Sequence, residues 1–109
     1  MKDRRKFQRY NRQIPVKIEW EGNEMEAQLA DLSMTGAGCY IPKRLPLYSD
    51  VVIHFLPEDP FSSDDEIFSC TSIVVRCCKS QTDKQYQLGL FFTHLSEEIL
   101  SRIMDLAYY

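Results

Sequence analysis

An alternation of apolar and polar residues runs through most of this chain and limits what it can fold into. Every second residue is apolar in each of four segments, 16–20, 25–29, 51–55 and 86–92. Successive side chains of a β-strand point to opposite faces, so this period predicts strands with one buried face. A sheet of such strands must either pack against another layer or close on itself.

Turn and loop signals separate the predicted strands. The tripeptide EGN at 21–23 is typical of a hairpin turn, and segments 41–50, 57–66 and 79–84 are rich in proline, serine and charge. Strands of this length and spacing are typical of a small barrel or sandwich. We expect an all-β domain of about six antiparallel strands, and a barrel is favoured because it leaves no exposed sheet edge.

The end of the chain changes to a helical period. One helical face collects the apolar residues of this segment: Leu95, Ile99, Ile103, Leu106 and Ala107. Ser96 is a suitable N-cap, and the two glutamates that follow it suit the positive end of a helix dipole. We therefore expect one C-terminal helix over about residues 95–107, which covers one side or mouth of the barrel or packs across a homodimer.

Positive charge is concentrated at the N-terminus. Residues 1–12 hold six of the 13 basic residues and one of the 16 acidic residues, a net charge of +5, so the rest of the chain has a net charge of −8. A DNA-binding domain is usually basic over a whole face. A basic segment on an acidic body instead indicates a local anion site. We expect residues 1–12 to form a flexible basic arm and residues 13–109 to form one domain.

Few residues could carry catalysis. The two histidines, His54 and His94, are predicted to be ordinary surface or hydrogen-bonded side chains. The acidic run at 64–66 lies in a serine-rich loop, which favours a solvated loop over a metal site. The chain contains neither a Walker loop nor a dinucleotide-binding glycine motif. We expect no enzymatic activity, no metal and no cofactor.

The cysteines and the hydropathy pattern indicate a cytoplasmic protein. Cys39, Cys70, Cys77 and Cys78 show no CxxC spacing and are predicted to be reduced and structural. No apolar stretch approaches the roughly 20 residues that span a bilayer. The N-terminus lacks the apolar segment of a secretory signal.

A glycine-rich connection, DLSMTGAG at 31–38, lies between two predicted strands. Asp31 and Ser33 can hydrogen-bond the local backbone and shape a turn. Gly36 and Gly38 permit a positive φ or a close approach of the backbone to a ligand. Taken alone, this stretch indicates a polar connection between strands.

Two short motifs occur together in this chain. Arg5 and Arg9 form R-x-x-x-R, and residues 31–36 form D-x-S-x-x-G after an alternating strand. Far downstream, YQLGLFFTHLSEE at 86–98 runs from a strand through a glycine into the final helix. This combination resembles the PilZ domain, a bacterial receptor for cyclic di-GMP, over nearly the whole chain. The resemblance implies a stand-alone six-stranded antiparallel barrel with a C-terminal helix, in which the ligand lies where the arm meets the second motif.

The resemblance implies a set of ligand-binding residues: Arg5, Arg9, Asp31, Ser33 and Gly36. An arginine can hold a phosphate in a bidentate fork, stack on a base, or donate to guanine O6 and N7. The aspartate would accept hydrogen bonds from a guanine edge or fix an arginine, and the serine would bond a phosphate or a base. The glycine would let the backbone approach the ligand.

Three further residues are candidates for the same site. Arg4 would help to hold a second cyclic di-GMP, or it is a solvated charge. Gly38 offers the same backbone access as the motif glycine. Arg76, like Arg12, either lies on the surface or lines the pocket.

A relay mechanism follows from the charge of the arm. Repulsion among its cations would keep the arm mobile without ligand, and a dianionic ligand would draw it onto the barrel. The ordering cost is taken from the binding free energy. The ordered arm then presents a changed surface to an effector protein.

Two other classes of function stay open. A small nucleic-acid-binding barrel would use aromatic stacking beside a basic groove, which the acidic body disfavours. A PilZ-like interaction module would bind a protein and no nucleotide, through the loop at 57–66 or through Tyr108 and Tyr109. Packing of the last helical turn is the alternative role for these tyrosines. The effector, the process controlled and the number of ligands per chain are not specified by the sequence.

Overall fold

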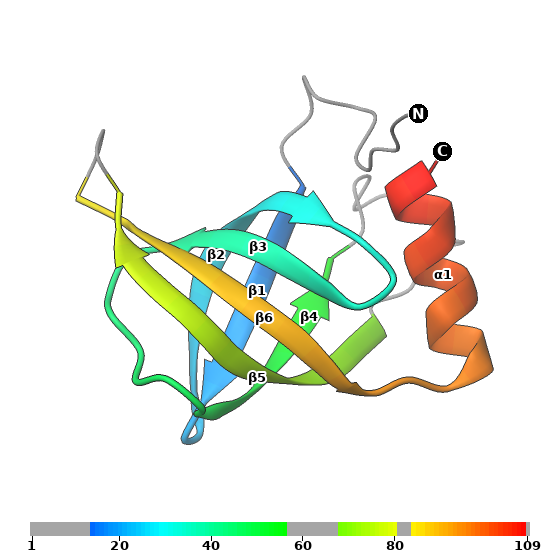
Figure 1. Cartoon of the computed structure of the whole chain (residues 1–109), viewed down its shortest axis with the longest axis horizontal. Helices are drawn as coiled ribbons and strands as arrows, with labels where there is room; N and C mark the ends of the chain where they lie inside the picture. Colours follow the sequence, from blue (N-terminus) through cyan, green and yellow to red (C-terminus); the bar gives the residue numbers. More distant parts are fainter. Residues whose placement is uncertain (1–13, 57–67, 81–83, 109) are drawn as a thin grey trace.

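The computed structural model describes residues 14–56, 68–80 and 84–108 of the chain. Within these residues it is a closed, six-stranded antiparallel β-barrel followed by one helix (Figure 1). The elements are β1 (Pro15–Trp20), β2 (Asn23–Leu32), β3 (Gly36–Ile41), β4 (Asp50–Phe55), β5 (Phe68–Lys79), β6 (Tyr86–His94) and α1 (Glu97–Tyr108). The predicted fold class is confirmed.

The strands follow one another around the barrel in the order β1-β2-β3-β6-β5-β4. β1 closes the barrel by pairing with β2 on one side and with β4 on the other. The pairing of β3 with β6 joins segments that are far apart in the sequence and aligns residues 36–41 with residues 86–91. Every strand therefore has two neighbours, which removes the exposed edges of an open sheet.

The predicted hairpin turn lies between β1 and β2. Trp20 pairs with Asn23, and the two residues between them, Glu21 and Gly22, have φ angles of 53° and 81°. Positive φ at both central residues is the requirement of a type I′ turn, whose twist matches that of the flanking strands. Glycine adopts this conformation without steric cost.

The inward-facing residues of the strands form one core. Its largest fully buried side chains include Phe55, Ile18, Ile53 and Leu88. Phe55 also stacks on Phe68, with 4.6 Å between the ring centroids. Buried and solvent-facing positions alternate along β1 and β4, as the period-two pattern predicted.

The C-terminal helix packs against β2 and β5 and lies along one side of the barrel (Figure 1). It begins at Glu97, two residues later than predicted, because Ser96 is its N-cap. The Ser96 hydroxyl accepts a hydrogen bond from the Ile99 N–H at 3.1 Å. Ile103 is fully buried, which fixes the apolar face against the barrel. No helix among the described residues is long and apolar enough to cross a membrane.

Candidate functional site

The predicted D-x-S-x-x-G motif occupies the junction of β2 and β3. Asp31 lies near the end of β2, Ser33 lies in the turn, and Gly36 begins β3. The R-x-x-x-R motif and the rest of the arm fall outside the described residues, as does the loop at 57–66. The structure therefore places the part of the predicted site that belongs to the barrel.

The strand register aligns four residues side by side across four neighbouring strands. Asp31 of β2 pairs with Gly38 of β3, which pairs with Gly89 of β6, which pairs with Arg76 of β5. We call this set the Asp31–Arg76 row. Adjacent strands lie about 4.8 Å apart, so three spacings put about 14 Å between the backbones at its two ends. The row thus has an acid at one end, a base at the other and two glycines between them.

A β-bulge aims Asp31 outward. The pairing of β2 with β3 skips Ala30, which is the extra residue between Leu29 and Asp31. Leu29 is buried, so simple alternation would also bury Asp31. The extra residue reverses the phase, which leaves Asp31 exposed and Leu32 buried.

A second bulge has the same effect on Arg76. In β5 the extra residue is Val75, between Val74 and Arg76. Val74 is buried, Arg76 is exposed, and Cys77 again packs against the core. Both charged ends of the row therefore face solvent because a bulge precedes each of them.

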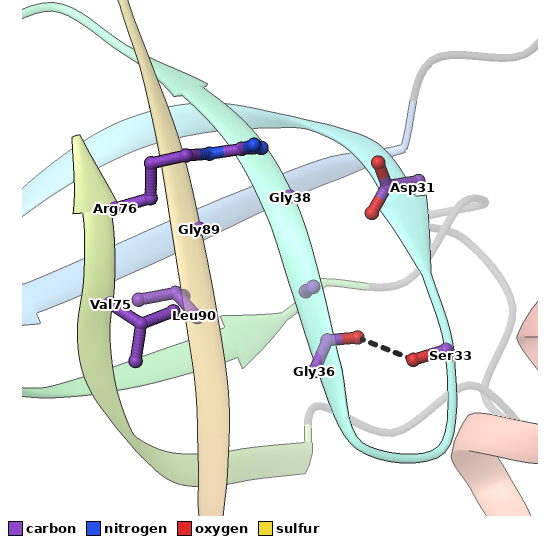
Figure 2. A pocket seen from close by; sticks show the side chains of 9 residues that line it. Asp31, Ser33, Gly36, Gly38, Val75, Arg76, Gly89 and Leu90 are labelled. Atoms are coloured by element: carbon purple, nitrogen blue, oxygen red, sulfur yellow. Dashed lines mark hydrogen bonds between the residues drawn. The ribbon is translucent and has the colours of Figure 1, made fainter. Parts of the chain in front are cut away.

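The two glycines contribute no side chain, so only backbone lies beneath the charged side chains of the row. We call this stretch of backbone, at Gly38 and Gly89, the glycine floor. A Cβ on Gly38 would lie 3.0 and 3.1 Å from the two Asp31 carboxylate oxygens, and a Cβ on Gly89 would lie 3.2 Å from Arg76 Cβ. Figure 2 shows the Arg76 side chain extending from β5 over Gly89 toward β3. Neither glycine has a positive φ, so these positions require space and not a special backbone conformation.

Gly36 has a structural role that the sequence did not indicate. A Cβ at this position would collide with the backbone carbonyl oxygen of Leu90 in the paired strand β6. Its φ is not left-handed either. The close approach that the structure shows at Gly36 is therefore between β3 and β6.

Ser33 holds the turn between β2 and β3. Its hydroxyl oxygen accepts a hydrogen bond from the Thr35 N–H at 3.3 Å and lies 3.5 Å from the Gly36 carbonyl oxygen (Figure 2). Its backbone N–H donates to the same carbonyl at 2.9 Å. A serine side chain that bonds the backbone two residues on is a common turn device. These contacts keep the Ser33 hydroxyl beside Gly36 at the start of β3.

The row and the turn line one shallow pocket on the outside of the barrel. Its lining residues are Asp31, Ser33, Gly36, Ala37, Gly38, Val75, Arg76, Gly89 and Leu90. The pocket volume is about 440 Å³, within the usual range for small-molecule sites. Five residues singled out from the sequence therefore lie together in space: Asp31, Ser33, Gly36, Gly38 and Arg76.

No sequence pattern assigned a role to Gly89 or to Val75. A glycine inside an alternating strand was the available signal for Gly89, because such a residue often marks a bulge or a close approach. Nothing in the sequence marked Val75 as a bulge residue, because a valine fits an inner or an outer strand position equally well. Only the register shows that it sets the direction of Arg76.

The two buried thiols do not line this pocket. Cys39 and Cys70 are both in the core. Burial raises the pKa of Cys39 to about 12, with a smaller contribution from the Asp31 charge, and burial raises the pKa of Cys70 to about 11. All four cysteines are free thiols, as predicted. Such neutral thiols act as small apolar side chains.

Comparisons with known proteins agree with this architecture. The family model of the PilZ domain matches residues 3–109. Similar solved structures include the inhibitor of motility MotI/DgrA of Bacillus subtilis (TM-score 0.73, 10% identity, covering 96% of this chain and 49% of that chain). The PilZ domain of YcgR from Escherichia coli, solved with c-di-GMP, gives a TM-score of 0.62 at 14% identity and covers 96% of this chain and 92% of that chain.

The PilZ domain of CeSA from a cellulose-synthesizing bacterium is also similar, with a TM-score of 0.60 and 18% identity over 89% of this chain and 91% of that chain. This chain spans about half the length of MotI/DgrA. A search of curated protein sequences found no significant match. At these identities the solved structures share the fold.

Proposed function

Because the chain belongs to the PilZ domain family, we propose that it is a receptor for cyclic di-GMP that binds and signals without catalysis. The pocket around the Asp31–Arg76 row is the barrel half of the proposed site. One observation carries the proposal: the D-x-S-x-x-G motif, a bare glycine floor and an exposed arginine lie in one pocket. Arg5 and Arg9 supply the other half from the arm.

The glycine floor suits the flat face of a guanine. Once the Arg76 side chain turns away from Gly89, a base over Gly38 and Gly89 would rest on backbone, with no Cβ to hold it away. At one end of the row the Asp31 carboxylate accepts hydrogen bonds from the N–H edge of the base. At the other end the Arg76 guanidinium stacks on a base or donates to guanine O6 and N7.

The two phosphates of the ligand need cations that the row does not supply. Asp31 and Arg76 nearly cancel in charge, and among the described residues neither is held in an ion pair. The arm, with a net charge of +5 over residues 1–12, provides the missing positive charge. Ligand binding therefore draws the arm onto the barrel, and the ordered arm is the surface that an effector protein reads.

Isothermal titration of the chain with cyclic di-GMP tests the proposal, with GTP and linear pGpG as controls. We expect saturable binding of the cyclic ligand alone. Arg5→Ala or Arg9→Ala should abolish or greatly weaken binding and leave the barrel folded. The stoichiometry distinguishes one ligand from a pair, and loss of the second ligand in Arg4→Ala would assign that arginine.

A matched pair of variants tests the barrel half of the site. Arg76→Ala should weaken binding about tenfold or more, since hydrogen bonds to charged groups contribute about 1.5–3 kcal/mol. Lys84→Ala removes the same charge from an exposed residue outside the pocket and should bind like the wild type. Equal affinities for both variants would remove Arg76 from the site.

Two outcomes would overturn the proposed function. A well-folded chain that gives no heat with cyclic di-GMP would indicate the interaction module that binds no nucleotide. A gel shift with RNA or single-stranded DNA, in the absence of cyclic di-GMP binding, would indicate the nucleic-acid-binding barrel. Sedimentation with and without ligand shows whether a homodimer takes part.

A further inference from the structure

A second cluster of polar side chains lies on the outer face of β4, β1 and β2. Of these three strands, only β2 also contributes a residue to the Asp31–Arg76 row. Glu19, Glu24 and His54 each bring one ligand atom here, and the three atoms lie within 4.8 Å of one another. We propose that these residues bind a divalent transition-metal ion of the Zn²⁺ class, independently of the nucleotide site.

The donor set favours this class of ion. Imidazole nitrogen and carboxylate oxygen are both ordinary Zn²⁺ ligands, whereas Mg²⁺ prefers oxygen ligands alone. One histidine and two glutamates supply three protein ligands and leave a fourth position for water. The three ligands come from three adjacent strands, so no sequence spacing reveals them.

The charges around the cluster favour a cation. Glu19 and Glu24 are direct cross-strand partners, and like charges at such positions are destabilising. Glu19 also lines a shallow pocket with Glu21 and Asp50, which adds negative potential. Among the described residues, the Lys17 ammonium is 3.9 Å from Glu24, at the limit of an exposed ion pair, and such pairs contribute little.

Two hydrogen bonds fix the orientation of the His54 ring. Its Nε2 lies 3.0 Å from Glu19 Oε1, and its Nδ1 lies 2.6 Å from the hydroxyl of Ser69 on β5. Because a carboxylate only accepts, the contact with Glu19 places a proton on Nε2. A metal ion would displace that proton and take the Nε2 lone pair, which leaves the ring proton on Nδ1. The Ser69 oxygen can accept that N–H, since a hydroxyl both donates and accepts. Metal-bound histidines commonly have such a partner on the other nitrogen.

Titration of the chain with ZnCl₂, followed by heat and by thermal unfolding, tests the site, and MgCl₂ is the control. We expect one saturable Zn²⁺ site, a raised Tm and no response to Mg²⁺. His54→Gln and Glu24→Gln should each weaken Zn²⁺ binding at least tenfold. His94→Gln, which alters the other histidine, should bind like the wild type. Circular dichroism checks that each variant is folded.

Exposed thiols also bind Zn²⁺, so a further control is needed. Cys78→Ser removes the exposed cysteine and should leave the binding unchanged. Ser69→Ala should weaken binding about 10- to 100-fold through the orientation of His54, and Ser69→Thr should restore it. Wild-type affinity in His54→Gln, or loss of binding in Cys78→Ser, would overturn the proposal. Binding of Zn²⁺ by a chain that ignores cyclic di-GMP would support this site and contradict only the nucleotide site.

Discussion

Replacing Gly38 by alanine tests the glycine floor most directly. The new Cβ would lie 3.0 Å from Oδ1, 3.1 Å from Oδ2 and 3.2 Å from Cγ of Asp31. Unstrained contacts between carbon atoms are about 3.5–4.0 Å, so the carboxylate must move by a few tenths of an ångström. Asp31 is exposed and can turn away, whereas the paired backbones on either side stay in place.

The fold should tolerate this substitution, but the ligand should not. Glycine inside a strand costs about 0.5–1 kcal/mol relative to alanine, which offsets the displacement of one exposed side chain. The free energy of unfolding should therefore change by less than about 1 kcal/mol. The displaced Asp31 carboxylate would lose its hydrogen bond to the ligand. A hydrogen bond to a charged group contributes about 1.5–3 kcal/mol, so this loss should weaken cyclic di-GMP binding about 10- to 150-fold.

Calorimetric titration and urea unfolding measure the two quantities on one preparation. Gly22→Ala is the matched control, because its Cβ would meet nothing within 4 Å. This control should keep its affinity for the ligand and lose about 1 kcal/mol of stability, since φ at Gly22 is 81°. If Gly38→Ala bound cyclic di-GMP within twofold of the wild type, the position of Asp31 would not matter and the proposed site would be wrong.

Four further results are expected. Gly36→Ala should lower the free energy of unfolding by at least about 2 kcal/mol, measured in urea, because its Cβ meets the Leu90 carbonyl; unchanged stability would contradict the close approach of β3 to β6. At pH 8 a thiol reagent should label only Cys77 and Cys78 in the folded chain, by mass spectrometry, because burial raises the pKa of the other two thiols to about 12 and about 11. Below about pH 9 these thiols are neutral in both the folded and the unfolded chain, so the fold keeps its full stability. As the pH rises from 9 toward 12, the thiols ionise more readily in the unfolded chain, and the free energy of unfolding should fall in a pH series. Cyclic di-GMP affinity should fall with added salt, since part of the binding is charge pairing, and a constant affinity would argue for stacking alone.

The sequence predicts the barrel well because each strand is short and buries one face. Burial of alternate residues leaves a period-two pattern that needs no partner strand to be recognised. The turn at 21–23 and the N-cap at Ser96 were equally local, and both are confirmed. The closure of the barrel depends on the pairings of β1 with β4 and of β3 with β6, which join distant segments and leave no local pattern.

The site was only partly predictable, because many of its contacts join strands that are distant in the sequence. The motif indicated Asp31 and Ser33, whose order in the chain is local information. Nothing local shows that Gly89 lies beneath Arg76, because that contact crosses from β6 to β5. The two bulges, at Ala30 and Val75, also cannot be recognised from the sequence. Alternation alone places the residue that follows each of them on the wrong face of the sheet. The predicted arm stays a prediction, since it lies outside the described residues.

The Asp31–Arg76 row runs at right angles to the strands and takes one residue from each of four of them. Ladder hydrogen bonds fix its geometry, so the connections at the ends of the barrel do not contribute to it. Such connections tolerate insertions at small entropic cost. Evolution can therefore lengthen or rewrite the other loops without moving the pocket, as long as the β2–β3 turn that carries Ser33 is kept. Under the proposed function, the recognition of cyclic di-GMP and the choice of effector protein can therefore change independently of each other.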